Sequence, residues 1–266
     1  MPEEAAAAPA APPTAPATDR HAWTDRLWGS GHLLPGGDTE ALRLAALLPL
    51  SPQTTLLLVG AGAGGAAAAI AGARGTFVAA HDASLAGRQR AAPPLRKLAR
   101  RVTLEPWNPA APEFRPAYHH HALLLEPLRQ GGTPEALFAG LGPALRPDAQ
   151  IVLLELVLRQ PAARGLDRWC ALEARGLPPT EATVSQALRH AGYEVHVTED
   201  AGPRQVQAVL EGWTQLVTTL DGEGQGPAAG EAATLVAEAE AWLLRLRLLR
   251  EGRIALVRWH ASLRRG

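Results

Sequence analysis

The stretch from residue 55 to residue 82 constrains the fold more than any other part of the sequence. It opens with an apolar run at 55–59 that lacks polar alternation and is typical of a strand buried on both faces of a parallel sheet. A glycine-rich turn follows, and the residues after it predict a helix over 66–73 and a second strand over 76–80. Asp82 closes the stretch. Strand, glycine turn, helix, strand and acid together predict one nucleotide-binding βαβ unit.

The glycine turn fits two ligand patterns. Gly60, Gly62 and Gly65 satisfy the GxGxxG spacing of dinucleotide-binding proteins, whereas Gly60, Gly62 and Gly64 satisfy the GxGxG spacing of S-adenosylmethionine (SAM) enzymes. Glycines allow a tight turn and a close approach of backbone to ligand, and the Asp82 carboxylate can accept hydrogen bonds from ribose hydroxyls. A purely structural interpretation, in which small residues only pack a helix on a sheet, also remains open.

Strands and helices continue to alternate after Asp82. Apolar runs predict strands over 102–104, 122–125, 151–158 and 194–198, and leucine spacing predicts helices over 134–145 and 180–191. This alternation is typical of an α/β protein whose sheet carries helices on both faces. We therefore expect a doubly wound, Rossmann-like sheet.

The segments outside this core suggest a single domain with additions. Residues 1–19 are mostly Ala and Pro and predict a disordered tail, because nothing in them can bury an apolar face. Glu3 and Glu4 stand where a signal peptide would carry basic residues. The remaining divisions are a cap segment over 20–50, the core over 51–200, helices at 204–220 and 231–250 within 201–251, and a last strand at 254–260 within 252–266.

Several motifs, taken in order over 23–198, resemble the class I SAM-dependent methyltransferases. The glycine turn and Asp82 match the family's first two motifs, and the passage over 137–155 resembles its leucine-rich helix, proline and following strand. Ala191-Gly192-Tyr193 is similar to the AGF that precedes the family's sixth strand. The sequence over 28–37 resembles the lead-in of small-molecule methyltransferases that act on phosphoethanolamine, methylated glycines or prenylated quinols. The resemblance implies seven strands, with a closing antiparallel strand after the inserted helices.

The resemblance also implies a site. SAM would lie across the ends of the first two strands. The catalytic residues are not identified from the sequence. Trp28 and its neighbours would cover the acceptor or, as an alternative, form the apolar edge of a docking helix. The expected cofactor-binding residues are Gly60, Gly62, Gly64, Asp82, Trp107 and Asn108, and the expected residues near a small-molecule acceptor are Trp28, His32 and Glu126.

Three departures from the family pattern keep other functions open. Leu58 stands where the first strand usually carries an acid, Trp107-Asn108 replaces the usual aspartate after the third strand, and Asp148-Ala149 replaces a glycine pair. The first alternative is a catalytically inactive methyltransferase-fold protein that binds or contacts a partner. The second is an NAD(P)-binding oxidoreductase; its short-chain form is excluded, because Tyr118 is followed four residues later by Ala122 rather than by lysine.

Composition excludes several classes of protein. The 26 basic and 26 acidic residues cancel, which argues against a nucleic-acid binder that neutralises many phosphates. No apolar run is long enough to span a membrane, so we expect a cytoplasmic protein. The sequence leaves the oligomeric state open. Five arginines near the end (Arg245, Arg247, Arg250, Arg253 and Arg258) are typical of a solvated face, with a lid for an anionic substrate or a partner surface as alternatives.

Two further candidates for chemistry have structural explanations. In His119-His120-His121, consecutive side chains on a strand point to alternate faces and no acid or cysteine stands at ligand spacing, so we expect a polar strand entry near the sheet edge and no metal. Cys170, the single cysteine, is expected to be a packed helix residue rather than a nucleophile.

Overall fold

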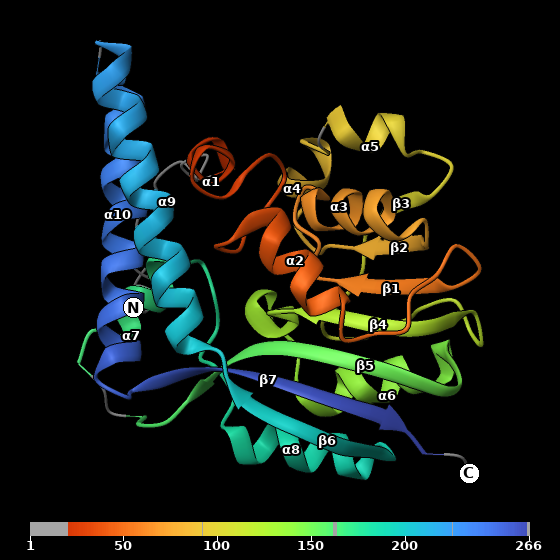
Figure 1. Cartoon of the computed structure of the whole chain (residues 1–266). Coiled ribbons are helices and arrows are strands. Elements are labelled where there is room, and N and C mark those ends of the chain that lie inside the picture. The colour runs from red at the N-terminus through yellow and green to blue at the C-terminus, as the bar shows by residue number, and fades with distance from the viewer. Residues whose placement is uncertain (1–20, 92, 162–163, 225, 265–266) are drawn as a thin grey trace, which may run out of the picture.

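The computed structural model describes residues 21–91, 93–161, 164–224 and 226–264 (Figure 1). The tail predicted over residues 1–19 lies outside the described residues. Among the helices that are described, none combines the length and apolarity needed to cross a bilayer.

Within the described residues, seven strands form one sheet in the order β3-β2-β1-β4-β5-β7-β6. Strands β1 to β5 are parallel, and β7 pairs antiparallel with both β5 and β6. The predicted doubly wound sheet of seven strands is confirmed. The strands are β1 Thr55–Val59, β2 Phe77–His81, β3 Val102–Glu105, β4 His119–Leu125, β5 Leu145–Leu158, β6 Tyr193–Asp200 and β7 Ile254–Leu263.

Apolar side chains of the central strands alternate between two cores, because successive residues of a strand face opposite sides of the sheet. Leu56 and Leu58 of β1 belong to the core under α2 (Gly37–Ala45) and α3 (Gly65–Arg74). Leu57 and Val59 belong to the core under α6 (Pro134–Ala144) and α8 (Glu181–His190). Helices therefore cover both faces (Figure 1), and shorter helices lie at α4 Leu85–Gln89, α5 Pro93–Lys97 and η1 Pro127–Gln130.

The insertion between β6 and β7 is a long helical hairpin, as the sequence predicted. Helices α9 (Gly202–Glu223) and α10 (Ala229–Arg250) stand side by side beyond one end of the sheet, next to α1 (His21–Trp28) and α7 (Leu166–Leu172) (Figure 1). A third apolar cluster joins α1 to the hairpin, and within it the rings of Trp28 and Trp242 meet edge to face at 5.1 Å. The members of this cluster are Trp23, Leu27, Trp28, Val209, Leu216 and Trp242.

The three consecutive histidines open a strand, as predicted, but the prediction that this strand entry lies near the sheet edge is wrong. All three lie within β4, which pairs with β1 on one side and β5 on the other. His119 and His121 are buried, with 1% and 8% of their surface exposed. Burial lowers the pKa of each to about 4, so both rings are neutral at pH 7. These histidines are core residues of a central strand.

Candidate functional site

The glycine turn has the backbone conformation that its sequence predicted. Gly60, Gly62 and Gly64 have φ angles of 81°, 60° and 88°, which lie in the left-handed region that side chains disfavour. The turn connects β1 to α3 at the edge where the parallel strands end. This is the edge at which ligands of doubly wound proteins bind.

Asp82 lies at this edge, directly after β2, but its carboxylate is engaged within the protein. One oxygen accepts a hydrogen bond from the backbone N–H of Gly62 at 2.7 Å. The other accepts from the backbone N–H of Ser84 at 2.8 Å and from the side-chain amide of Gln130 at 3.0 Å. Asp82 has no exposed surface. The carboxylate therefore holds the glycine turn and does not face a hollow that a ribose could enter.

Gln130 was not identified from the sequence. Its amide oxygen also accepts a bond from the backbone N–H of Ala83 at 2.9 Å, so the side chain covers the end of β2 from the segment that follows β4. A lone glutamine 48 residues beyond Asp82 carries no sequence signal for this contact.

Side chains of the protein also cover the glycine turn. A Cβ atom added at Gly62 would lie 2.7 Å from Leu33 Cγ, and one added at Gly64 would lie 2.5 Å from Leu95 Cδ1. At Gly65 the added atom would meet His32 Cδ2 and the carbonyl oxygen of Ser30, each at 2.6 Å. The glycines thus admit the protein's own chain at the positions where a ligand would approach the backbone.

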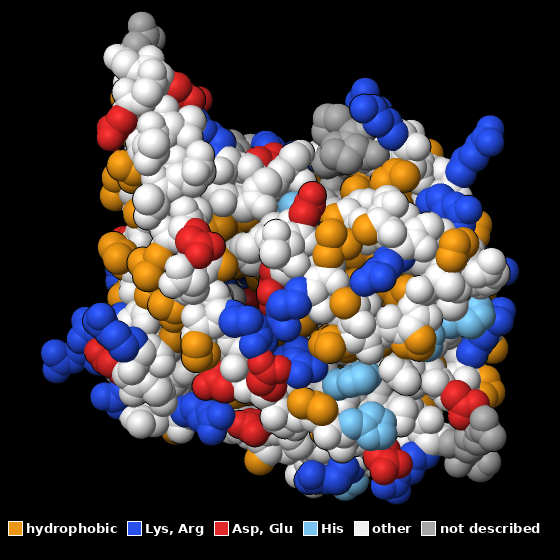
Figure 2. All heavy atoms as spheres, viewed as in Figure 1, with side chains coloured by type: hydrophobic (Ala, Val, Ile, Leu, Met, Phe, Trp, Pro, Cys, Tyr) orange, Lys and Arg blue, Asp and Glu red, His pale blue; other side chains and the backbone are white. Residues whose placement is uncertain are grey.

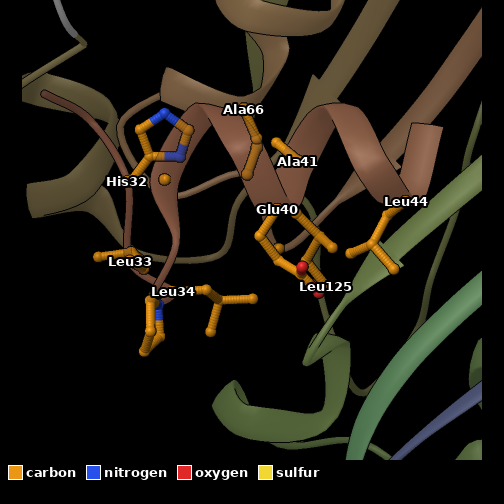
Figure 3. Close-up of a pocket in the computed structure, with 12 residues that line it drawn as sticks. His32, Leu33, Leu34, Glu40, Ala41, Leu44, Ala66 and Leu125 are labelled. Atoms are coloured by element: carbon orange, nitrogen blue, oxygen red, sulfur yellow. The ribbon is translucent and has the colours of Figure 1, made fainter. Parts of the chain in front are cut away.

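Two hollows lie between the cap segment and the glycine-turn region. An open one of about 810 Å³ runs beside the start of α3, with Trp28, His32 and Gly65 among its lining residues. The one that touches Gly60 is very small. Its volume is about 20 Å³, and its lining includes Gly60 and Ala61. Leu33, Leu34 and Leu125 also line it (Figure 3). One water molecule needs about 10–15 Å³, whereas sites for drug-sized ligands span about 300–1,000 Å³. The hollow at Gly60 cannot hold a nucleoside.

The two consecutive residues expected beside an adenine ring both have contacts within the protein. Trp107 is buried, with 8% of its surface exposed, and stacks on Phe114 at a centroid distance of 6.1 Å. Asn108 is exposed, and its side-chain oxygen accepts a bond from the backbone N–H of Ala110 at 3.0 Å. The tryptophan is part of the core on the α6 side of the sheet, and the asparagine stabilises its own turn.

The residues expected near an acceptor are also engaged. Trp28 packs on Trp242, which corresponds to the docking-edge alternative rather than to an open substrate cover. His32 is 6% exposed, and its Nε2 lies 2.7 Å from a carboxylate oxygen of Asp38.

Glu126, the third of these residues, belongs to a buried cluster of charges where β4 and β5 end. Its carboxylate forms an ion pair with Arg245 of α10 and another, at 3.2 Å, with Arg175. Arg175 also lies 3.5 Å from Glu155 of β5, and Arg245 lies 3.5 Å from Glu173. The side chains of these five residues are at most 1% exposed. A solvated face, the ordinary interpretation of the C-terminal arginines, is therefore wrong for Arg245, and also for Arg258, which is 6% exposed.

Each member of this cluster has further contacts that fix its position. Glu155 accepts hydrogen bonds from the backbone N–H groups of Leu128 and Leu156, both at 2.9 Å. Burial raises the pKa of Glu155 to about 7, although Arg175 opposes the change. The two guanidinium groups lie over tryptophan rings, Arg175 over Trp169 and Arg245 over Trp242, each at 4.9 Å.

Sequence reasoning identified Glu126 and missed three other members of the cluster, Glu155, Glu173 and Arg175. A glutamate inside an otherwise apolar strand was a usable signal for Glu155, because a buried carboxylate requires a partner. The cluster fastens α10 and the segment after α7 to the ends of β4 and β5. In a doubly wound protein this place lies beside the ligand site.

Comparisons with known proteins identify the architecture. No family model matches the sequence, and no curated protein matches it either. Solved structures do match: phosphoethanolamine N-methyltransferase 2 of Haemonchus contortus, in complex with SAM, superposes with a TM-score of 0.78 at 16% identity, over 91% of this chain and 56% of that one. The chain therefore spans little more than half the length of that enzyme.

Two further solved structures have the same fold. Geranyl diphosphate C-methyltransferase of Streptomyces coelicolor A3(2) has a TM-score of 0.63 at 17% identity, over 84% of this chain and 78% of that one. The [4+2]-cyclase SpnF has a TM-score of 0.66 at 18% identity, over 94% and 95%. The fold is that of the class I methyltransferases. At these identities the likeness establishes the methyltransferase fold and leaves the reaction open.

The structures of the two methyltransferases contain SAM or S-adenosylhomocysteine. The glycine turn of this chain can therefore be compared with the space that such a ligand needs. Here the Asp82 carboxylate is enclosed, Leu33 and Leu95 lie against the glycine turn, and the hollow at Gly60 holds about 20 Å³. In this arrangement the face of the turn at Gly60, Gly62 and Gly64 has no room for SAM.

Proposed function

We propose that this protein is a non-catalytic methyltransferase-fold protein, which uses the fold for binding contacts and not for methyl transfer. The observation that carries the proposal is the closed glycine turn, in which side chains of the protein occupy the approach to Gly62 and Gly64. Leu58 supports it, because it is fully buried at the position where the family usually carries an acid.

The buried charges at the neighbouring strand ends support the same proposal. An acceptor site needs a hollow beside the cofactor, but here Glu126 and Glu155 are paired with arginines that come from outside the core sheet. Separating the hairpin from this edge would break the ion pairs that join Glu126 to Arg245 and Glu173 to Arg245. These contacts therefore hold the hairpin against the place where an acceptor would lie.

Isothermal titration calorimetry and thermal denaturation with SAM, S-adenosylhomocysteine and NAD(P) test the proposal. We expect no binding heat and an unchanged melting temperature with every ligand. Binding would be detected, because a ligand present at 100 times its Kd would stabilise the fold by about 2.7 kcal/mol. Saturable binding of S-adenosylhomocysteine that Asp82→Ala abolishes would refute the non-catalytic function. Binding of NAD(P) alone would favour the oxidoreductase alternative.

A second candidate is a SAM-dependent methyltransferase that acts on a small molecule. One observation favours it: the three glycines keep left-handed backbones, and Asp82 still bonds to Gly62, as a cofactor-binding turn requires. For this candidate, the segment that carries Leu33 would have to move away from the glycine turn before SAM could bind. SAM would then contact Gly60, Gly62, Gly64, Asp82, Trp107 and Asn108, and the acceptor would lie near Trp28, His32 and Glu126.

The Leu33→Ala variant separates the two candidates. If Leu33 only gates a working cofactor site, truncating it increases the affinity for S-adenosylhomocysteine, and adding Asp82→Ala removes the gain. If the site has been lost, neither variant binds the ligand. Leu177→Ala is the control, because the Leu177 side chain is 59% exposed and belongs neither to the hairpin nor to the glycine turn.

A further inference from the structure

The outer face of the helical hairpin carries a ladder of exposed apolar residues. Leu210 and Val217 of α9 are each 52% exposed, and Val236 and Leu243 of α10 are each 67% exposed. In both helices the two residues are seven positions apart, a spacing that places them on one face. Leu210 and Leu243 line the same groove, so the two faces coincide. Figure 2 shows hydrophobic side chains along this part of the molecule.

This ladder is distinct from the contacts that hold the hairpin to the rest of the protein. Val209 and Leu216 of α9 and Trp242 of α10 are buried against α1. The ladder residues belong to none of the three apolar clusters of the described residues. The hairpin therefore has one face packed on its own chain and a second face that is not covered by the part of the chain that the structure describes.

Helical geometry puts the ladder in two layers. The start of α9 lies level with the end of α10, because a Cβ atom at Gly202 would be 3.8 Å from Leu249 Cδ2. With a rise of about 1.5 Å per residue, Leu210 and Leu243 both lie about 10 Å from this base, and Val217 and Val236 both lie about 20 Å from it. The centre of the ladder is thus about 15 Å from the base.

The two ends of the ladder carry different charges. Arg247 and Arg250 stand at the base, one and two turns beyond Leu243, and line the same groove as Leu243. At the base, Arg247 is paired with Glu251, Asp200 also lines the groove, and Arg250 is the arginine without an ion pair among the described residues. Asp221 stands one turn beyond Val217, about 28 Å from the base. Among the described residues no ion pair engages Asp221 either. A half-turn about the centre of the ladder would bring Asp221 to the level of Arg247 and Arg250.

We propose that this face binds the same face of a second copy of the protein, so that two hairpins pair about a two-fold axis. Each apolar layer then packs on the opposite layer of the partner, and Asp221 of each copy faces Arg250 of the other. Such an isologous contact uses one self-complementary patch twice. This inference concerns a surface remote from the glycine turn, and it does not depend on whether the protein binds SAM.

Sedimentation velocity or light scattering on the full chain tests the pairing. We expect a dimer at about 10–50 µM protein, at concentrations where many specific complexes form. Leu243→Glu should shift the population to monomer, whereas the control Leu177→Glu should not. A monomer across the whole concentration range, or a dimer that Leu243→Glu leaves intact, would overturn the proposal.

Charge reversal tests the two-fold register separately from the apolar contact. Asp221→Arg and Arg250→Asp should each weaken the dimer, because each places like charges opposite one another, and the double variant should restore it. Circular dichroism establishes that every variant folds. A double variant no better than the single ones contradicts the register. Cosedimentation of the wild type, but not of Leu243→Glu, with vesicles of anionic lipid would show instead that this face meets a membrane.

Discussion

At the scale of single residues, Gly62 and Gly72 show two different uses of glycine in one segment. Gly62 has a φ of 60°, and a Cβ atom there would press on Leu33. Gly72 lies within α3, where a Cβ atom would meet nothing within 4 Å. Only the first position needs glycine, because the second would gain helix propensity from a side chain.

The variants Gly62→Ala and Gly72→Ala should therefore change stability in opposite directions. We expect Gly62→Ala to lower the free energy of unfolding by about 1–3 kcal/mol through backbone strain, and Gly72→Ala to raise it by about 0.5–1 kcal/mol. Urea denaturation measures both. Adding Leu33→Ala to Gly62→Ala should not restore full stability, since the strained φ persists.

Glu155 makes the stability of the protein depend on pH. Burial raises the pKa of this carboxyl from 4.5 to about 7 in the folded state, so the proton is held more tightly by the folded than by the unfolded chain. The stabilisation is full below pH 4.5 and is lost as the pH rises through 7. In Glu155→Gln the side chain stays neutral, so the variant should gain stability relative to wild type between about pH 5 and pH 8.

Glu251→Gln is the matched control for this pH series. Glu251 is exposed, and the hydrogen bond from Arg247 lowers the pKa of its carboxyl, so it stays ionised over the whole window. The difference in free energy of unfolding between Glu251→Gln and wild type should therefore be the same at about pH 5 and at about pH 8. An equally flat difference for Glu155→Gln would show that the buried carboxyl is ionised throughout.

At the scale of elements, the decisive feature is how α10 meets the ends of β4 and β5. Arg245 is fully buried and reaches Glu126 and Glu173, which are 119 and 72 residues away in the sequence. Helix periodicity predicted α10 but gave Arg245 no partner, because partners so remote leave no local pattern. Glu126 could be placed at the strand end, yet whether it faces a ligand or an arginine is decided by tertiary packing.

Arg245→Met should destabilise the protein by about 3–5 kcal/mol, because it leaves two buried carboxylates short of a cation. Combining it with Glu126→Gln should cost less than the sum of the two single changes, by about 1–3 kcal/mol. Arg247→Met, at an exposed position of the same helix that pairs with Glu251, should change stability by less than about 1 kcal/mol. Guanidinium denaturation of the four variants measures these differences, and strict additivity would contradict the buried pairing.

At the scale of the whole molecule, the architecture was more predictable than the site. The order of apolar runs predicted the sheet and the inserted hairpin, because burial on both faces of a strand leaves a strong sequence signal. Polar signals were less reliable: His119 and His121 lie in a central strand, although histidines there suggested an edge. The closure over Gly62 and Gly64 depends on Leu33 and Leu95, two leucines that no sequence pattern distinguishes from core residues.

The hairpin and the sheet should remain one unit when the chain is cut between α9 and α10. The C-terminal fragment contains β7, which lies between β5 and β6, and its Trp242 and Arg245 are buried against other elements. A protease site engineered between Glu223 and Ala229 should give two fragments that elute together on native gel filtration. Separation of the fragments without denaturant would show that these contacts are weaker than the structure indicates.

The placement of β7 also sets an order of events during synthesis. β6 leaves the ribosome well before β7, yet in the sheet its partner is β7. Until α9, α10 and β7 have been made, β6 and the α8 helix before it can join the nascent domain only through side-chain packing. The backbone hydrogen bonds that β6 makes to β7 in the sheet are not yet formed. The emerging chain therefore carries an exposed strand for the time needed to translate more than fifty residues, and this interval is when it would be most exposed to aggregation and most suited to a chaperone.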